Sequence, residues 1–203
     1  MHLKTLSLGL AAALTTTFAL AAPVDYKIDP THTTTVFSWN HLGFLTPSAN
    51  FTDIQGVIKV DNTQPANSSV EVAIPLSSIN SSVAALDKEF RAKAWFNAAK
   101  YPNITFKSTK VETKDKKHFK ITGDLTVKGI TKPVVLYAVL NGQGKHPMLK
   151  VPAIGFNATT SFNRSDFGLG SYVPMVGDKI TVNITTEATV RSKLQGIRKY
   201  KTF

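Results

Sequence analysis

Five residues in two separate regions of the chain carry the side chains most able to do chemistry: His32, His41, Arg164, Ser165 and Asp166. His41, Ser165 and Asp166 are the residue types of a nucleophilic hydrolase, but they lack the recognisable arrangement of nucleophile, base and orienting group that such a site needs. His32 and His41 lie on one predicted strand without the spacing of a known metal site. We therefore expect structural or mouth-lining histidines, and no catalytic residue, metal or cofactor.

The chain contains no cysteine. This excludes disulfides, a thiolate nucleophile and a cysteine-based metal site. Arg164 and Asp166 lie in the long connection 163–178, before the last predicted strand. A charge pair there would either hold the connection in place or flank an opening.

Eight segments alternate apolar and polar residues, which is the pattern of β-strands with one buried face. In the hairpin 119–140, Gly129 relaxes the backbone at the turn and Pro133 stands where a strand can start without donating a ladder hydrogen bond. Antiparallel strands of this kind predict a mainly β fold, and a barrel is favoured because a sandwich would leave long unprotected edges. The six other predicted strands are 25–42, 51–60, 69–76, 104–108, 148–162 and 180–190.

One segment has a helical period instead. Residues 82–98 lack Gly and Pro, and Asp87 precedes Arg91 by four residues, as in a helix-stabilising ion pair. This predicts one helix between strands three and four, ended by Tyr101-Pro102 because a residue before proline favours extended geometry. We expect the helix to cap or line one end of the barrel.

The inward positions of the predicted strands mix large and small side chains. Gly56, Gly123 and Ala138 are small, and small residues that face one another leave room, while aromatic residues would wall it. Such an elongated apolar space fits a lipid chain, although a solidly packed interior remains an alternative. The residues expected to contact a ligand are Phe37, Trp39, His41, Leu42, Phe44, Phe51, Val72, Ile74, Leu86, Phe90, Phe96, Phe106, Leu125, Leu136, Ala138, Phe156, Phe162, Arg164 and Asp166.

The outer face of the second hairpin strand carries Val135, Tyr137 and Val139, which we call the outer stripe. A lone barrel has no need of an apolar outer face. The outer stripe therefore predicts a contact with a second copy of the chain, as a homodimer, or with another partner.

The N-terminus predicts export. Residues 1–21 combine Lys4, an apolar run and Ala19-Leu20-Ala21, as in a secretory signal peptide cleaved after Ala21. The remaining chain divides into a barrel domain, 22–190, and a basic tail, 191–203. The net charge of +11 falls to +10 without the signal peptide, whose one charged residue is Lys4. Export makes anionic lipid head groups, pyrophosphates or an acidic protein better partners than nucleic acid, although solubility alone is an alternative explanation of the charge. The basic tail is a candidate for contact with an anionic membrane surface, with a solvated tail as the alternative.

Several segments together resemble the YceI-like polyisoprenoid-binding family: YKIDPTHTTTVFSWNHLGF, FTDIQGVI, WFNAAKYPNITFKS, ITGDLTVKGITKPVVL and GFNATTSFNRSDFGL. The resemblance spans nearly all of 25–190 and implies a lipocalin-like barrel holding a polyprenyl-type chain, commonly in the bacterial periplasm. One departure is Leu86, where an arginine is common. The residues that match the family pattern are Asp29, Pro30, His32, His41, Leu42, Gly43, Phe44, Asp87, Phe96, Tyr101, Pro102, Arg164, Asp166, Phe167 and Gly168.

The leading hypothesis is therefore a periplasmic lipid carrier that is not an enzyme, with an eight-stranded antiparallel lipocalin-like β-barrel. A second hypothesis is a structural or interaction protein with a filled barrel that binds a partner through the outer stripe. A third is a hydrolase using His41 with Ser165. A connected internal void would separate the first two, and the distance between His41 and Ser165 would decide the third.

Overall fold

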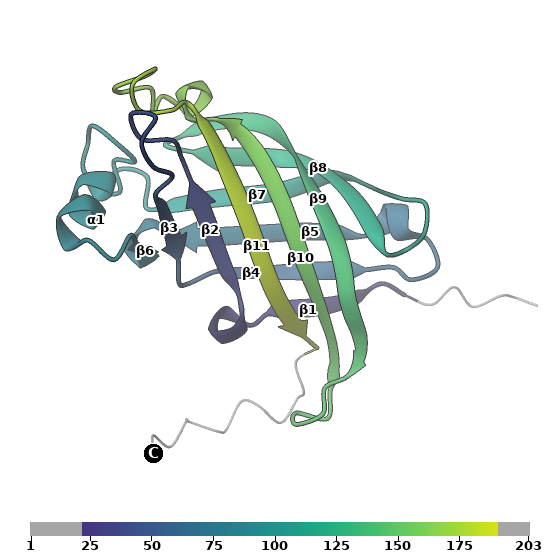
Figure 1. The fold of residues 1–203 in the computed structure, drawn as a ribbon. Coiled ribbons are helices and arrows are strands. Elements are labelled where there is room, and N and C mark those ends of the chain that lie inside the picture. Colours follow the sequence, from purple (N-terminus) through teal and green to yellow (C-terminus); the bar gives the residue numbers. More distant parts are fainter. Residues whose placement is uncertain (1–21, 191–203) are drawn as a thin grey trace, which may run out of the picture.

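A computed structural model describes residues 22–190, which form a β-barrel with one α-helix beside an end of it (Figure 1). The predicted signal peptide and basic tail lie outside the described residues. The helical elements are η1 Pro30–His32, η2 Pro65–Asn67, η3 Leu76–Ser78, α1 Ala84–Arg91 and η4 Arg164–Phe167. The strands are β1 Val24–Ile28, β2 Thr34–Ser38, β3 Ser48–Phe51, β4 Gln55–Val60, β5 Ser69–Pro75, β6 Ile79–Asn80, β7 Asn103–Thr113, β8 His118–Val127, β9 Ile130–Lys145, β10 Pro152–Asn163 and β11 Lys179–Thr189.

Eight of the strands close into an antiparallel ring in the order β1-β4-β5-β7-β8-β9-β10-β11, with β1 also paired to β11. The other three extend this ring. β2 pairs with β11 and β3, and β3 pairs with β6, so β1/β2, β3/β4 and β5/β6 behave as three interrupted strands. The predicted mainly β fold with an eight-stranded antiparallel barrel and one helix is confirmed.

The continuous strand predicted for 25–42 is wrong in one respect, because η1 interrupts it. Pro30 has no backbone N–H to give to a ladder, and Asp29 Oδ1 accepts the backbone N–H of Thr31 at 2.9 Å, which caps the 3-10 turn. Beyond η1, the ladder resumes where Thr34 pairs with Thr185. Because of the interruption, β1 pairs with β4, whereas β2, on the other side of η1, pairs with β3.

The hairpin of β8 and β9 is confirmed, with a two-residue turn at Lys128 and Gly129, which have φ values of 52° and 77°. Both residues are left-handed, as this tight turn requires, and glycine adopts that conformation freely. β9 begins at Ile130 rather than at Pro133. It pairs with β10 only from Tyr137 onward, so one side of the strand is unpaired at Pro133 and the missing N–H costs no ladder bond there.

The helix is much shorter than the predicted 82–98. α1 ends at Arg91, and Ala92 is extended with φ −66° and ψ 163°. The physical reason is that Phe90 and Phe96 are both buried in the core, with ring centroids 6.1 Å apart. Six residues along a continuous helix would put them about 120° apart around its axis, too far for one helix face to bury both rings in the same cluster. The chain must therefore leave the helix to bury both rings.

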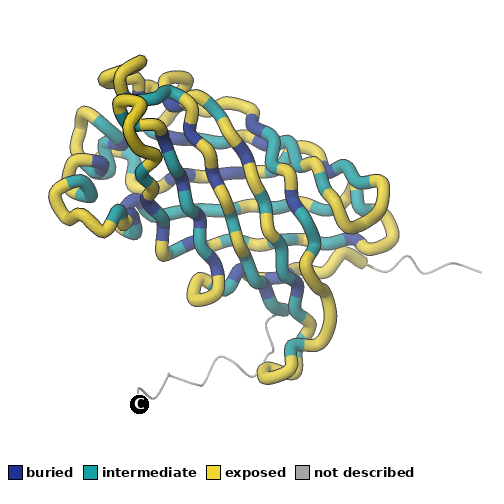
Figure 2. The backbone as a smooth tube through the Cα atoms, viewed as in Figure 1, coloured by how far each residue is buried: buried dark blue, intermediate teal, exposed yellow. Residues whose placement is uncertain are grey.

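Buried and exposed residues alternate along the barrel strands, as β11 shows most clearly (Figure 2). The buried positions face the barrel interior, where they form one apolar cluster. Across residues 22–190, no helix has the length and apolar character needed to cross a membrane.

Candidate functional site

A cavity of about 600 Å³ occupies the barrel interior. Its volume is within the range typical of small-molecule sites, roughly 300–1,000 Å³. Side chains from the interrupted strands, the continuous strands, α1 and the connection 163–178 all reach it. The predicted contact residues that line this cavity are Phe37, Trp39, His41, Phe51, Val72, Ile74, Leu86, Phe90, Phe96, Phe106, Leu125, Leu136, Ala138, Phe156, Phe162 and Arg164.

Leu42, Phe44 and Asp166 do not line the cavity, which corrects their predicted placement. After His41 the chain turns tightly, since the N–H of Phe44 donates to the carbonyl of His41 at 3.1 Å. This turn directs Leu42 and Phe44 outward, and the Phe44 side chain is 87% exposed. Asp166 is exposed on η4. An apolar residue type was therefore not enough to place a loop residue inside.

Several lining residues were missed because they lie outside the alternating strands. The irregular connection 163–178 has no period from which a buried face could be predicted. The residues Phe167 and Leu169 are nonetheless buried in the core. The only signal in the sequence was a run of apolar residues in an otherwise polar connection. The missed residues of this kind are Trp95, Phe167, Leu169, Tyr172 and Val176.

The small inward residues do not all contribute space. A Cβ at Gly123 would lie 2.4 Å from Phe106 Cζ, so the Phe106 ring already occupies the room that glycine leaves. A Cβ at Gly56 would lie 2.3 Å from the carbonyl oxygen of Glu71. Both glycines allow close packing of the wall. Ala138 and Ala158, by contrast, do line the cavity.

An aromatic cluster forms the cavity wall beside α1, with Phe90 at its centre. The Phe90 ring centroid lies 6.0 Å from that of Phe37, 5.7 Å from that of Trp39 and 6.0 Å from that of Trp95. These contacts are edge-on, the geometry that aromatic pairs favour. α1 thus supplies a single ring that joins β2 to the segment after the helix.

Threonines form a more polar stripe on one wall. Thr33, Thr35 and Thr186 all line the cavity. Thr35 pairs with Ile184 on β11, and the hydroxyls of Thr33 and Thr186 lie 3.0 Å apart. Thr160, on β10, also lines the cavity. The opposite wall, from β5 to β9, is aliphatic and aromatic. A ligand would therefore meet hydroxyl groups on one side only.

Arg164 is 5% exposed and holds the connection 163–178 together from within. Its Nε donates to the carbonyl of Gly177 at 2.9 Å, one Nη donates to Ser171 at 2.9 Å and to Val176 at 2.8 Å, and the other donates to Leu169. Burial lowers the pKa of Arg164, while the charge of Asp178 acts to raise it. The predicted pairing with Asp166 is wrong, because backbone carbonyls take up the guanidinium.

The geometry of a hydrolase is not formed. Ser165 Oγ donates to Asp178 Oδ2 at 2.6 Å, and the Ser165 N–H donates to Asp178 Oδ1 at 2.9 Å. Among the described residues, no hydrogen bond joins His41 to Ser165. His41 instead lines the cavity near its mouth. Ser165 therefore ties η4 to the start of β11.

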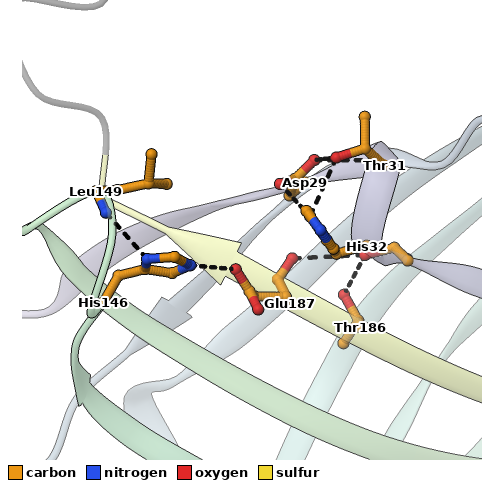
Figure 3. A network of polar contacts seen from close by, with 8 residues as sticks. Asp29, Thr31, His32, His146, Leu149, Thr186 and Glu187 are labelled. Atoms are coloured by element: carbon orange, nitrogen blue, oxygen red, sulfur yellow. Dashed lines mark hydrogen bonds and ion pairs between the residues drawn. The ribbon is translucent and has the colours of Figure 1, made fainter.

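Asp29, His32 and Glu187 form a polar network where η1 meets β11, with His146 beside it (Figure 3). Ligand atoms of the first three lie within 4.8 Å of one another, so they are the residues best placed to hold a metal. However, the Asp29 carboxylate already accepts from Thr31 and contacts His32 Nδ1 at 2.9 Å. The hydrogen-bonding capacity of Asp29 is thus already used to hold η1 in place, which disfavours an open metal site.

The same contacts shift two pKa values in this network. The hydrogen bond to Asp29 raises the pKa of His32. Partial burial acts to raise the pKa of Asp29, but hydrogen bonds from His32 and Thr31 outweigh it and the pKa is lowered. His146 Nε2 lies 3.2 Å from Glu187 Oε1, in ion-pair range but not aligned as a hydrogen bond. The network thus fastens η1 and the β9–β10 hairpin to β11.

The outer stripe lies on the outside of β9, as predicted. Tyr137 is 59% exposed, and Val135 and Val139 are half-buried. Tyr137 stands opposite Lys120 on one side and Thr159 on the other. The apolar stripe is thus one strand wide and has polar neighbours.

Comparison with known proteins gives the same fold and a family. A UPF0312 protein of Photorhabdus laumondii is 36% identical over 199 residues, covering 97% of this chain and 98% of its own. The crystal structure of Burkholderia cenocepacia BcnA superposes with a TM-score of 0.72 at 20% identity, covering 80% of this chain and 99% of BcnA. A polyisoprenoid binding domain from Saccharophagus degradans superposes with a TM-score of 0.62 at 12% identity, covering 82% and 98%. Because the model of the YceI-like domain also matches residues 26–188, the chain belongs to the YceI-like family.

Proposed function

We propose that this protein binds a polyisoprenoid or a similar long-chain amphiphile inside its barrel and carries it in the periplasm. The observation that carries the proposal is the apolar cavity inside the barrel, whose lining includes Ile28 and Thr33 on either side of η1 as well as Leu45 and Tyr172 in the loops after β2 and η4. A cavity of about 600 Å³ disfavours the alternative of a filled barrel that serves only as a structural protein. The polyisoprenoid binding domain from Saccharophagus degradans shares the fold and supports this class of ligand.

The binding energetics are sufficient. Burying one five-carbon isoprene unit contributes about 3–4 kcal/mol gross, at about 0.8 kcal/mol per CH₂. A handful of such units offsets an association cost of roughly 4–15 kcal/mol and leaves micromolar binding or better. The head group then contributes orientation, and the threonine wall offers hydroxyl groups for it. No chemical step is required, so the proposal is for a binding protein and not an enzyme.

Native mass spectrometry of the full chain, expressed with its N-terminal segment and extracted gently, tests this proposal. We expect a bound long-chain apolar molecule, and a mature mass that begins at Ala22. Recovery from a periplasmic extract would support the proposed compartment. A ligand-free mass, together with no uptake of added polyprenol, would overturn lipid binding. An uncleaved mass in the cytoplasmic fraction would overturn the export proposal alone.

The remaining proposals concern partners. The outer stripe is a candidate dimer contact, and the basic tail is a candidate contact for an anionic membrane. Sedimentation velocity of wild type and Tyr137→Asp tests the first, since a dimer that depends on the outer stripe becomes a monomer in the variant.

A further inference from the structure

Two loops form the edge of the cavity mouth, and we call them the rim: residues 41–47 and 169–177. The loops are joined to one another, since the N–H of Leu42 donates to the carbonyl of Met175 at 3.0 Å and a β-bridge pairs His41 with Val176. Neither loop contains Asp, Glu, Lys or Arg, in a chain that is 18% charged. The rim is therefore one connected surface without an acidic residue, a lysine or an arginine.

The rim is strongly apolar and exposed. Phe44 is 87% exposed, and Tyr172 and Met175 are each 61% exposed. Leu42, Leu45 and Val173 are exposed as well, so the rim supplies six of the thirteen exposed large hydrophobic residues of the described chain. Single exposed apolar residues are ordinary on a protein surface, but a contiguous group marks an interaction site.

The rim is also continuous with the cavity. Leu45 and Pro47 from one loop and Tyr172 and Val176 from the other line the cavity wall. Leu45 and Tyr172 thus belong both to the exposed surface and to the interior. An apolar molecule can therefore pass from whatever covers the rim into the barrel along these side chains. Glu89 is the acidic residue of the cavity lining, and its Oε1 accepts the indole N–H of Trp95 at 2.9 Å.

Basic residues flank this apolar surface. The segment 82–100 contacts the rim, since the ring centroids of Trp95 and Tyr172 lie 6.4 Å apart. This segment contains two acidic residues and four basic ones, Lys88, Arg91, Lys93 and Lys100. The nearby turn carries Lys128, whose Nζ donates to the carbonyls of Ala94 and Gly168. An apolar tip with a basic flank is the pattern of a surface that binds anionic lipid bilayers.

The other end of the barrel has a smaller exposed apolar group, which is separate from the main cavity. Its hairpin turns contain the charged run Lys114-Asp115-Lys116-Lys117 and the segment 145–150, which has a lysine at each end. Met148 and Leu149 are exposed there, but they lie between lysines and do not line the main cavity. The two ends therefore differ in whether their exposed apolar residues connect with the main cavity, and this difference provides a control.

We propose that the rim docks on an anionic lipid bilayer, with Phe44 and Met175 entering the boundary between head groups and acyl chains. The ligand then moves between bilayer and cavity without exposure to water, a step that would otherwise expose every CH₂ of the chain. This role rests on the proposed lipid-binding function. A second copy of the chain fits the rim less well, because the basic flanks of two copies would repel each other and the two mouths would be closed.

Vesicle flotation tests the docking surface. The probe is a vesicle of phosphatidylethanolamine and phosphatidylglycerol, compared with one of phosphatidylcholine alone. We expect the double variant Phe44→Asp/Met175→Asp to lose at least tenfold in binding to the anionic vesicles. The matched control, Met148→Asp/Leu149→Asp, adds the same charge at the other end and should bind within twofold of wild type. Equal binding by the rim variant, or an equal loss in the control, would overturn the proposal.

Loading from detergent solution separates this proposal from the proposed function. Neither Phe44 nor Met175 lines the cavity, so the rim variant should take up a fluorescent polyprenol from micelles to the wild-type level but take it up at least tenfold more slowly from vesicles. If no protein loads from micelles while wild type still binds vesicles, lipid binding fails and rim docking stands. A wild-type dimer that the rim variant dissociates, without vesicle binding by either, would assign the rim to a second copy and overturn docking. Circular dichroism of both double variants serves as the check that they fold.

Discussion

Among single residues, Arg164 shows how position changes a role suggested by residue type. A lone arginine near a cavity is a natural partner for an anionic head group. Here its guanidinium donates to four backbone carbonyls in one connection, and its carbon Cζ lies 5.6 Å from the centre of the Trp95 ring. Its planar, forked set of donors fits this arrangement and an ammonium does not. Arg164 is therefore a positioning residue that shapes one half of the rim.

The substitution Arg164→Lys tests this role. We expect a loss of about 2–4 kcal/mol in the free energy of unfolding, because buried carbonyls lose their donors. Urea unfolding measures the loss, and Lys132→Met, a change at an exposed lysine, serves as the control. If Arg164 instead bound a head group, the variant would keep its stability and change its preference between a polyprenyl phosphate and the neutral alcohol.

At the scale of elements, the segment from Ser81 to Tyr101 is the least barrel-like part of the structure and forms one end of the site. α1 is only 8 residues long, and its start is fastened by Asp87, whose Oδ1 accepts the N–H and the hydroxyl of Ser81 at 2.7 and 2.6 Å. A helix of two turns has little stability of its own. Its position therefore depends on the packing of Phe90 against the aromatic cluster.

Phe90→Asp tests whether this segment belongs to the site. The carboxylate would face the apolar cavity, so we expect at least a tenfold loss in polyprenol loading while the β-sheet circular dichroism is unchanged. Val83→Asp is the matched control, because Val83 precedes α1 and is 54% exposed. Undiminished loading by the Phe90 variant would remove the segment from the site.

At the scale of the molecule, each of the eight ring strands is paired with a neighbour on both sides, so the barrel is closed. Its interior nevertheless contains a cavity of about 600 Å³. A protein of this kind gives up packing contacts that a filled core would supply. A ligand in the cavity restores those contacts. Binding and stability should therefore be coupled.

Thermal unfolding with isoprenols of increasing length measures this coupling. At a free concentration 100 times the dissociation constant, a ligand adds about 2.7 kcal/mol of stability, which corresponds to a rise of roughly 5–10 °C in Tm for a domain of this size. We expect the rise at a fixed concentration to grow with chain length until the cavity is filled. The Phe90→Asp variant should show little rise. Equal Tm values with and without every isoprenol would contradict a ligand-binding cavity.

The sequence by itself determined which residues of each strand face inward. The two-residue period of a strand is a local property, and burial of one face requires apolar residues at every second position. The sequence alone therefore placed Phe37, Val72 and Leu136 on the inward face, where they line the cavity. The number of strands in the ring followed from the same pattern. The tight turn at Gly129 followed from local backbone chemistry.

The tertiary structure alone decided features that depend on how non-periodic segments pack in three dimensions. The ring of Phe106 fills the space at Gly123, Phe90 and Phe96 end the helix at Arg91 by sharing one core, and backbone carbonyls of the same irregular connection accept hydrogen bonds from Arg164. The tertiary structure also decided that Phe44 points outward and that its loop is hydrogen-bonded to the loop that contains Met175. Neither loop has a period that predicts its burial, because each is shaped by hydrogen bonds to the other. The residues of the cavity wall could thus be predicted from the sequence, whereas those of its mouth could be identified only from the tertiary structure.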